Sequence, residues 1–163
     1  MHNIPKRTAG LALAALALAG TVVVASGATA QDPTPRTLTF KTLEKGSTFK
    51  HVRNTEPKSE RANLTGDVIV FTNPVADGAG TVVGTLYANC TTTKGARDFR
   101  RSTTTCTAVA ALRDGTLTVQ ANSRPGVPTT TGAVTGGTGS YANARGVFVA
   151  NDVSGDLTVT LAD

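Results

Sequence analysis

Very few side chains in this 163-residue sequence are of the types that carry out nucleophilic or metal chemistry. The only histidine beyond the N-terminal leader described below is His51, and the only cysteines are Cys90 and Cys106. No acidic residues cluster at the spacing of metal ligands. A hydrolytic triad needs a nucleophile, a base and a group that orients the base, and a metal site needs three or four ligands. The sequence therefore predicts neither a hydrolytic triad nor a metal site, and we expect no metal and no cofactor.

The N-terminus has the pattern of a cleaved signal peptide. Lys6 and Arg7 precede an apolar run from Ala9 to Ala25, and Ala28-Thr-Ala30 follows as a small-residue cleavage site. A membrane anchor is the alternative, because the apolar run approaches the length that spans a bilayer. The cleavage site and the proline soon after it argue against an anchor. We expect residues 1–30 to be removed and the protein to be secreted to the extracellular space with no stable membrane anchor.

Export decides how the two cysteines are interpreted, because exported chains meet oxidising conditions. Cys90 ends the strand-like run Thr81–Cys90, and Cys106 lies near the start of the next run, Thr104–Leu112. Two strands joined by a long turn would place the cysteines opposite each other, close enough for a bridge. A redox-active pair would be expected at Cys-x-x-Cys spacing, which is absent. The sequence predicts a structural disulfide.

The part of the chain that remains after cleavage has the length of one domain and little net charge. Without Lys6 and Arg7 it carries 14 basic and 11 acidic residues, and aromatic residues make up 4% of the sequence. This composition gives no reason to expect nucleic-acid binding. We expect a flexible segment at residues 31–36 and a single domain over residues 37–163, with homo-oligomerisation left open.

The stretch Val134–Gly146 has three glycines within four positions, at 136, 137 and 139. A phosphate-binding loop would end in Gly-Lys-Ser/Thr, and a dinucleotide site would be followed by an amphipathic helix. Neither feature is present, so nucleotide binding is excluded here. A sharply bent backbone that leads into the apolar run Val147–Val153 is instead typical of a strand that turns a corner in a β-barrel.

Short β-type runs at regular spacing, separated by Gly- and Asp-rich turns, make up the rest of this domain, and none shows a sustained helical period. They indicate an all-β sandwich or barrel. With the corner expected in Val134–Gly146, we expect an eight-stranded antiparallel β-barrel. The expected strands are Thr37–Thr42, Val68–Phe71, Val82–Ala88, Cys106–Leu112, Thr116–Gln120, the segment around Val134, Val147–Val153 and Asp156–Leu161. Two polar, charged segments, Glu44–Asn63 and Thr91–Thr105, are expected to be long loops.

Small residues on one face of two expected strands would suit a barrel that holds a ligand in its lumen. The alternative is that the strands simply pack closely there. These residues are Gly84, Ala88, Ala108 and Ala110, with Leu86 among them.

Two segments resemble the allene oxide cyclase and dirigent superfamily. Gly136–Gly146 is similar to the Gly-Gly-Thr-Gly-aromatic segment followed by Ala-Arg-Gly, and Gly66–Asn73 is similar to the Gly-Asp-x-x-x-Phe-x-Asn segment of the cyclases. Together they span about residues 64 to 150. The resemblance implies a barrel that binds a small hydrophobic molecule in its lumen and directs the cyclisation or coupling of that molecule, by confinement and by a few polar groups.

The resemblance also supplies candidate ligand-binding residues. Asn73 matches a cyclase Asn that helps to hold a water at the substrate, and Arg145 matches the Arg of the dirigent Ala-Arg-Gly segment. The alternatives are a capped turn for Asn73 and a surface ion pair for Arg145. If the chain acts on a ligand, both side chains are expected in one cavity. The two tyrosines, Tyr87 and Tyr141, complete the set of candidates.

Departures from the family leave catalysis open. Cyclases carry a Glu and an Asn on the first strand, whereas here Glu44 aligns only loosely with that Glu and no Asn is present. Dirigent proteins have paired Asp residues where this chain has Thr72 and Asn73. The sequence thus leaves open whether the chain is an isomerase-like or dirigent-like enzyme, and no residue is assigned as catalytic. The alternatives are a non-catalytic secreted binding protein and a structural or interaction barrel of the cell envelope.

Overall fold

The computed structural model describes residues 35–55 and 62–162. The expected signal peptide lies outside these residues, as do residues 31–34 of the expected flexible segment. Most of the described chain is β-strand, with one short 3-10 helix, η1, at Phe99–Arg101. The strands are β1 (Arg36–Thr42), β2 (Thr48–Val52), β3 (Val68–Ala76), β4 (Val82–Lys94), β5 (Thr103–Leu112), β6 (Gly115–Ser123), β7 (Thr129–Gly139), β8 (Arg145–Asn151) and β9 (Asp156–Ala162).

Eight of these strands form a closed antiparallel barrel, as the sequence predicts. The strands pair in the order β1-β9-β8-β7-β6-β5-β4-β3, and β1 pairs again with β3 to close the ring. At this closure Lys41 and Thr42 lie opposite Ala76 and Val75. The eight strands expected from the sequence are the eight of the ring. β2 pairs with the part of β3 that extends beyond this closure, from Val68 to Thr72.

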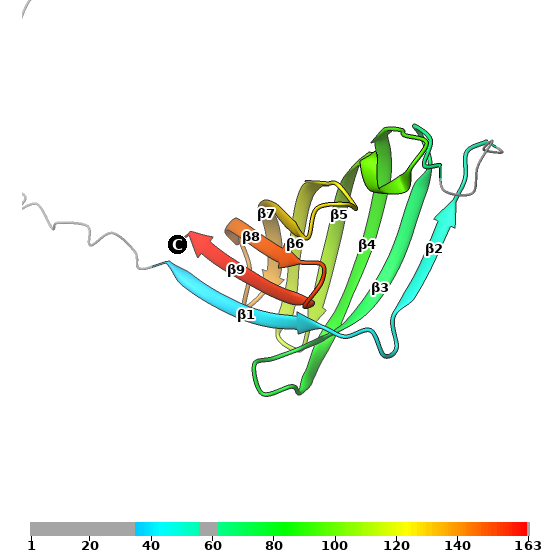
Figure 1. Cartoon of the computed structure of the whole chain (residues 1–163). Helices are drawn as coiled ribbons and strands as arrows, with labels where there is room; N and C mark the ends of the chain where they lie inside the picture. Colours follow the sequence, from blue (N-terminus) through cyan, green and yellow to red (C-terminus); the bar gives the residue numbers. More distant parts are fainter. Residues whose placement is uncertain (1–34, 56–61, 163) are drawn as a thin grey trace, which may run out of the picture. The chain divides into compact units, whose positions relative to one another are not determined.

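The ninth strand, β2, lies in the segment that was expected to be a loop, so that expectation is wrong. All five residues of β2 pair with β3, from Thr48 opposite Thr72 to Val52 opposite Val68. Figure 1 shows β2 beside β3, on the side away from β4. A strand of five mostly exposed residues has little periodicity of its own, and the long-range pairing with β3 is what makes it a strand.

The second expected loop is shorter than predicted. β4 continues to Lys94 and β5 begins at Thr103, so only residues 95–102, which include η1, connect the two strands. The Asp98 side chain accepts a hydrogen bond from the Arg100 amide and begins η1. Threonines at these ends of β4 and β5 favour extended backbone. The pairing of the two strands therefore continues beyond their apolar parts.

The Gly-rich stretch forms the last part of β7 and bends there, as expected. The pairing of β6 with β7 shifts register between Thr118 and Val119, opposite this stretch. A Cβ atom on Gly137 would lie 2.4 Å from the Tyr141 carbonyl oxygen and 2.5 Å from that of Thr116. Glycine is therefore required for the turn that carries Tyr141 to pack against β7.

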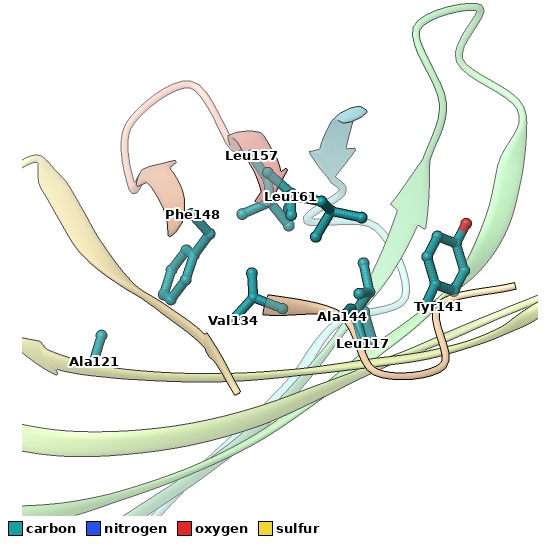
Figure 2. Packing of buried hydrophobic residues seen from close by; sticks show 10 residues of the cluster. Leu117, Ala121, Val134, Tyr141, Ala144, Phe148, Leu157 and Leu161 are labelled. Carbon is teal, nitrogen blue, oxygen red and sulfur yellow. The ribbon is translucent and has the colours of Figure 1, made fainter. Parts of the chain in front are cut away.

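One part of the barrel lumen is filled with buried side chains. Leu117, Val134, Tyr141, Ala144 and Leu161 belong to a cluster to which β5 to β9 and the β7–β8 turn contribute. Figure 2 shows Leu157 and Leu161 of β9 facing Val134 and Leu117, with Tyr141 at one end of the row and Ala121 at the other. The cluster stabilises the barrel by removing apolar surface from water.

The predicted disulfide is confirmed. Cys90 and Cys106 lie directly opposite each other on β4 and β5 and are bonded, with their Cα atoms 4.0 Å apart. The bridge joins two strands that already share a long ladder, and it closes the short connection that contains η1.

Removal of this bridge is expected to destabilise the fold without changing it. The double variant Cys90→Ala/Cys106→Ala should lose about 3 kcal/mol of unfolding free energy, because the bridge restricts the unfolded chain. Chemical denaturation of the variant and of reduced wild-type protein should give similar losses. Titration of denatured, unreduced wild-type protein should detect no thiol, and two free thiols would contradict the assignment.

Candidate functional site

The other part of the lumen is hollow. A cavity of about 530 Å³ is lined by residues from all nine strands, from η1 and from the β6–β7 and β8–β9 turns. This volume lies in the range of small-molecule sites in proteins. Ala88, Ala108, Ala110 and Ala121 line it, and short side chains at these positions leave the lumen unfilled.

All five phenylalanines of the chain line this cavity. Phe40, Phe71 and Phe148 extend inward from β1, β3 and β8, whereas Phe49 and Phe99 are supplied by β2 and η1. Phe49 is 65% exposed. A side chain that is apolar, exposed and next to a cavity offers contact surface that water covers poorly. Aromatic side chains are scarce in this sequence, so their concentration here is notable evidence of a binding surface.

The two explanations for the small residues each hold for part of the set. Leu86, Ala88, Ala108 and Ala110 line the cavity. Gly84 does not, and a Cβ atom there would lie 2.1 Å from the Ala111 carbonyl oxygen on β5. The alanines therefore make room in the lumen, and the glycine permits close strand packing.

Asn73 is the one predicted ligand-binding residue that reaches the cavity. It shares the inner face of β3 with Ile69 and Phe71, as the two-residue period of a strand predicts. Its side chain makes no hydrogen bond with the described residues, so it does not cap a turn. A half-buried amide among apolar walls leaves a donor and an acceptor available to a ligand or a water.

Arg145 does not share this cavity, so the expectation of one common site with Asn73 is wrong. Arg145 is exposed and lies on the same face of β8 as Val147 and Val149, which are also exposed. Phe148 and Ala150 occupy the alternate positions and line the cavity. The Arg145 guanidinium donates a hydrogen bond to the Ala144 carbonyl oxygen, at 2.7 Å.

Neither tyrosine lines the cavity. Tyr87 is 52% exposed on the outer face of β4, because its neighbours Leu86 and Ala88 face inward. Tyr141 is buried in the filled part of the lumen, where the Arg36 guanidinium lies 5.7 Å from its ring centre. Burial, and then the nearby Asp114 carboxylate, raise the pKa of Tyr141. The position of Tyr141 makes it a packing residue of the barrel.

A buried carboxylate holds β2, one wall of the cavity, to the barrel. Asp67 is fully buried and accepts hydrogen bonds from the backbone amides of Asn54 and Leu64, at 2.9 Å each. The His51 Nε2 atom lies 3.2 Å from the same carboxylate. The Thr48 and Thr72 hydroxyls, 2.8 Å apart, add a second link between β2 and β3. Asp67 thus serves the fold at a strand entry.

The ionisation of Asp67 is favoured despite its burial. Burial alone raises the pKa of this carboxyl group, but the backbone hydrogen bonds from Asn54 and Leu64, together with His51, outweigh burial and lower the pKa below its usual value. A carboxylate that accepts several hydrogen bonds is stabilised in its charged form. A charged Asp67 therefore contributes to the attachment of β2, beside the ladder that pairs β2 with β3.

Polar residues at one side of the cavity were not predicted from the sequence. Ser123, Thr130 and Asp152 line it together, and the Thr130 hydroxyl donates to the Asp152 carboxylate at 3.5 Å. They come from β6, β7 and the β8–β9 turn, so only the barrel pairing brings them together. Alternation along β7 could have placed Thr130 on the same face as Val134.

The described residues contain no group of three or more His, Cys, Asp or Glu that could hold a metal ion. No helix within residues 35–55 and 62–162 is long and apolar enough to cross a membrane.

Comparison with known proteins gives one family match. The family model described as "Allene oxide cyclase barrel like domain" matches residues 48–161. A search of curated proteins finds no match.

Solved structures with the same fold include a pyocyanin demethylase, with a TM-score of 0.62 and 22% identity, covering 78% of this chain and 99% of that one. They also include a pterocarpan synthase dirigent protein, with a TM-score of 0.52 and 20% identity, covering 78% of this chain and 80% of that one. At these identities the likeness concerns the fold alone.

The Asp67 contacts predict how stability depends on pH. Because the pKa of Asp67 is lowered on folding, its contribution is present above the unfolded-state pKa of about 4 and is lost as the pH falls through the folded-state pKa. Asp67→Asn should lower the free energy of unfolding by about 2 kcal/mol at pH 7 and flatten its fall between about pH 5 and pH 2.

Asp77→Asn is the matched control. Asp77 also accepts two backbone hydrogen bonds, from Ala79 and Thr81, but in an exposed turn. The Asp77→Asn variant should lose less unfolding free energy than Asp67→Asn does. The fall of its stability in acid should be close to that of wild type. Equal losses and parallel profiles for the two variants, measured by urea denaturation across pH, would contradict the role given to Asp67.

Proposed function

Because the chain belongs to the allene oxide cyclase barrel-like family, we propose that it is a secreted barrel that binds a small hydrophobic molecule in its cavity and directs the cyclisation or coupling of that molecule. Secretion is part of the proposal and rests on the signal-peptide pattern of residues 1–30.

The observation that carries the proposal is the convergence of all five phenylalanines on one hollow of about 530 Å³. An apolar cavity with a few polar groups is the usual form of a small-molecule site. A structural barrel has no need of such a hollow, since filling it would add packing contacts and stability. The open lumen therefore favours ligand binding over a purely structural role.

Confinement is the main contribution that this cavity can make to a reaction. A flexible, reactive molecule held between rigid strands is limited to few conformers, which lowers the entropic part of the barrier to ring closure or coupling. The Asn73 amide can donate to an oxygen on which negative charge develops, or hold a water there. The same fold in a pyocyanin demethylase and a pterocarpan synthase supports chemistry on small molecules by such barrels.

Binding without turnover is the second candidate. Glu44, which aligns loosely with the family's first-strand Glu, is exposed and does not line the cavity. A barrel without that acid could retain a ligand and leave it unchanged. Analysis of the bound molecule before and after incubation distinguishes the two candidates.

Native mass spectrometry of the protein purified from its host's culture medium is the direct experiment. We expect a chain that begins at Gln31 and a co-purified molecule of small mass that dissociates on denaturation. A chain found only inside cells would contradict the secretion part of the proposal. An extracellular chain that takes up no hydrophobic molecule, either from the host or from added compounds, would contradict the binding part.

Filling the cavity should abolish binding while the barrel remains folded. Ala108 is buried and lines the hollow, so Ala108→Phe should lower affinity for the co-purified molecule by at least about tenfold, equivalent to 1.4 kcal/mol. Thr107→Phe places the same side chain one residue away on the outer face and should bind as wild type does. Equal affinities for the two variants would contradict a ligand in the lumen.

A further inference from the structure

The charges that line the cavity are all of one sign. Asp152 and Asp156 are the only ionisable charged residues in its wall, which contains no Lys, Arg or His among the described residues. The chain as a whole has a net charge of +5. The charge of the cavity wall is therefore opposite in sign to the net charge of the chain, so it is a feature of this site and not of the overall composition.

Asp152 belongs to a group of polar residues in the cavity wall. Its Oδ2 atom accepts a hydrogen bond from Thr130 Oγ1 at 3.5 Å, and Thr130 Oγ1 lies 3.3 Å from Ser123 Oγ. All three residues line the cavity, so a row of hydroxyl groups ends at a carboxylate. The hydrogen bond to Thr130 is long and leaves most of the acceptor capacity of the carboxylate available.

Within residues 35–55 and 62–162, no basic residue forms an ion pair with Asp152. Burial raises the pKa of Asp152, and the Thr130 hydrogen bond only partly offsets this. Asp152 is nevertheless exposed by surface area, as expected for a carboxylate at the lip of a cavity. A carboxylate that has lost part of its hydration and lacks a cation gains more from a cationic partner than one in open water does.

Asp156, the first residue of β9, also belongs to the cavity wall. It accepts a hydrogen bond from the Ser154 hydroxyl at 2.6 Å within the β8–β9 turn, so it is fixed locally. Asp152 is therefore the carboxylate of the cavity wall that is left with free acceptor capacity. The phenylalanine rings in the cavity wall also favour cations over anions, since the faces of aromatic rings attract positive charge.

We propose that the ligand of this cavity has an apolar or aromatic body, held among the phenylalanines, and a protonated amine or another cationic group that pairs with Asp152. The inference rests on the proposed function, because it specifies the ligand of the same site. It excludes ligands with a carboxylate head, such as fatty acids, since that group would meet two like charges and no basic residue.

Three naphthalenes that share one ring system and differ in head group test this charge preference: 2-naphthylmethylamine, 2-naphthalenemethanol and 2-naphthoate. Calorimetric titration at pH 7 and low salt should rank the amine above the alcohol and the alcohol above the carboxylate, with about tenfold or more between amine and carboxylate. Raising the salt concentration should weaken amine binding and leave alcohol binding unchanged.

Isosteric variants test whether Asp152 is the residue that sets this charge preference. Asp152→Asn should reduce amine affinity about tenfold and leave alcohol affinity unchanged. Asp114→Asn, which removes the same charge from an exposed turn outside the cavity lining, should leave all three affinities near those of wild type. Equal affinity for amine and carboxylate in wild type, or an unaltered ranking in Asp152→Asn, would overturn this inference while the proposed function stands. Failure of all three compounds to bind would overturn the proposed function and this inference with it.

Discussion

The closed ladder of eight paired strands is the constraint on which the rest of the structure depends. Once β1 pairs with both β9 and β3, the register decides for every residue whether its side chain faces the lumen or the solvent. The lumen can then only be filled or left hollow, according to the size of the inward side chains. Leu117, Val134 and Tyr141 fill one part, and the alanines of β4 and β5 leave the other part open.

The hollow part is completed by pieces that the ring does not include. β2 brings Phe49 to the cavity and η1 brings Phe99. β2 pairs with one strand only. The buried Asp67 carboxylate fixes the chain at the end of β2, where it contacts the Asn54 and Leu64 amides and His51. A single charged group in the fold thus supports a wall of the proposed binding site.

Much of this architecture follows from local pattern. Alternation predicts the inner face of β3, and the positions of the two cysteines predict their bridge, because both depend on residues that are near neighbours in the ladder. The direction of Arg145 could not be predicted in the same way. Val147, Phe148 and Val149 are all apolar, so the pattern does not say which face is inside, and only the pairing of β8 with β7 and β9 decides it. β2, Phe99 and the Ser123–Thr130–Asp152 row depend on long-range contacts, and the only local signal among them is the alternation along β7, which indicates the face of Thr130.

The central claim is that the hollow of the barrel admits a small apolar molecule. Alanine methyl groups report on it directly, since Ala88, Ala108, Ala110, Ala121 and Ala150 line the cavity whereas Ala133 and Ala142 are exposed outside it. A carbon–proton correlation spectrum of alanine-methyl-labelled protein, titrated with 2-naphthalenemethanol, measures both sets at once. The account predicts saturable shifts of the five inward methyl groups, with those of Ala133 and Ala142 unchanged. Shifts confined to the outer methyl groups, or no saturable shift at any alanine, would contradict it.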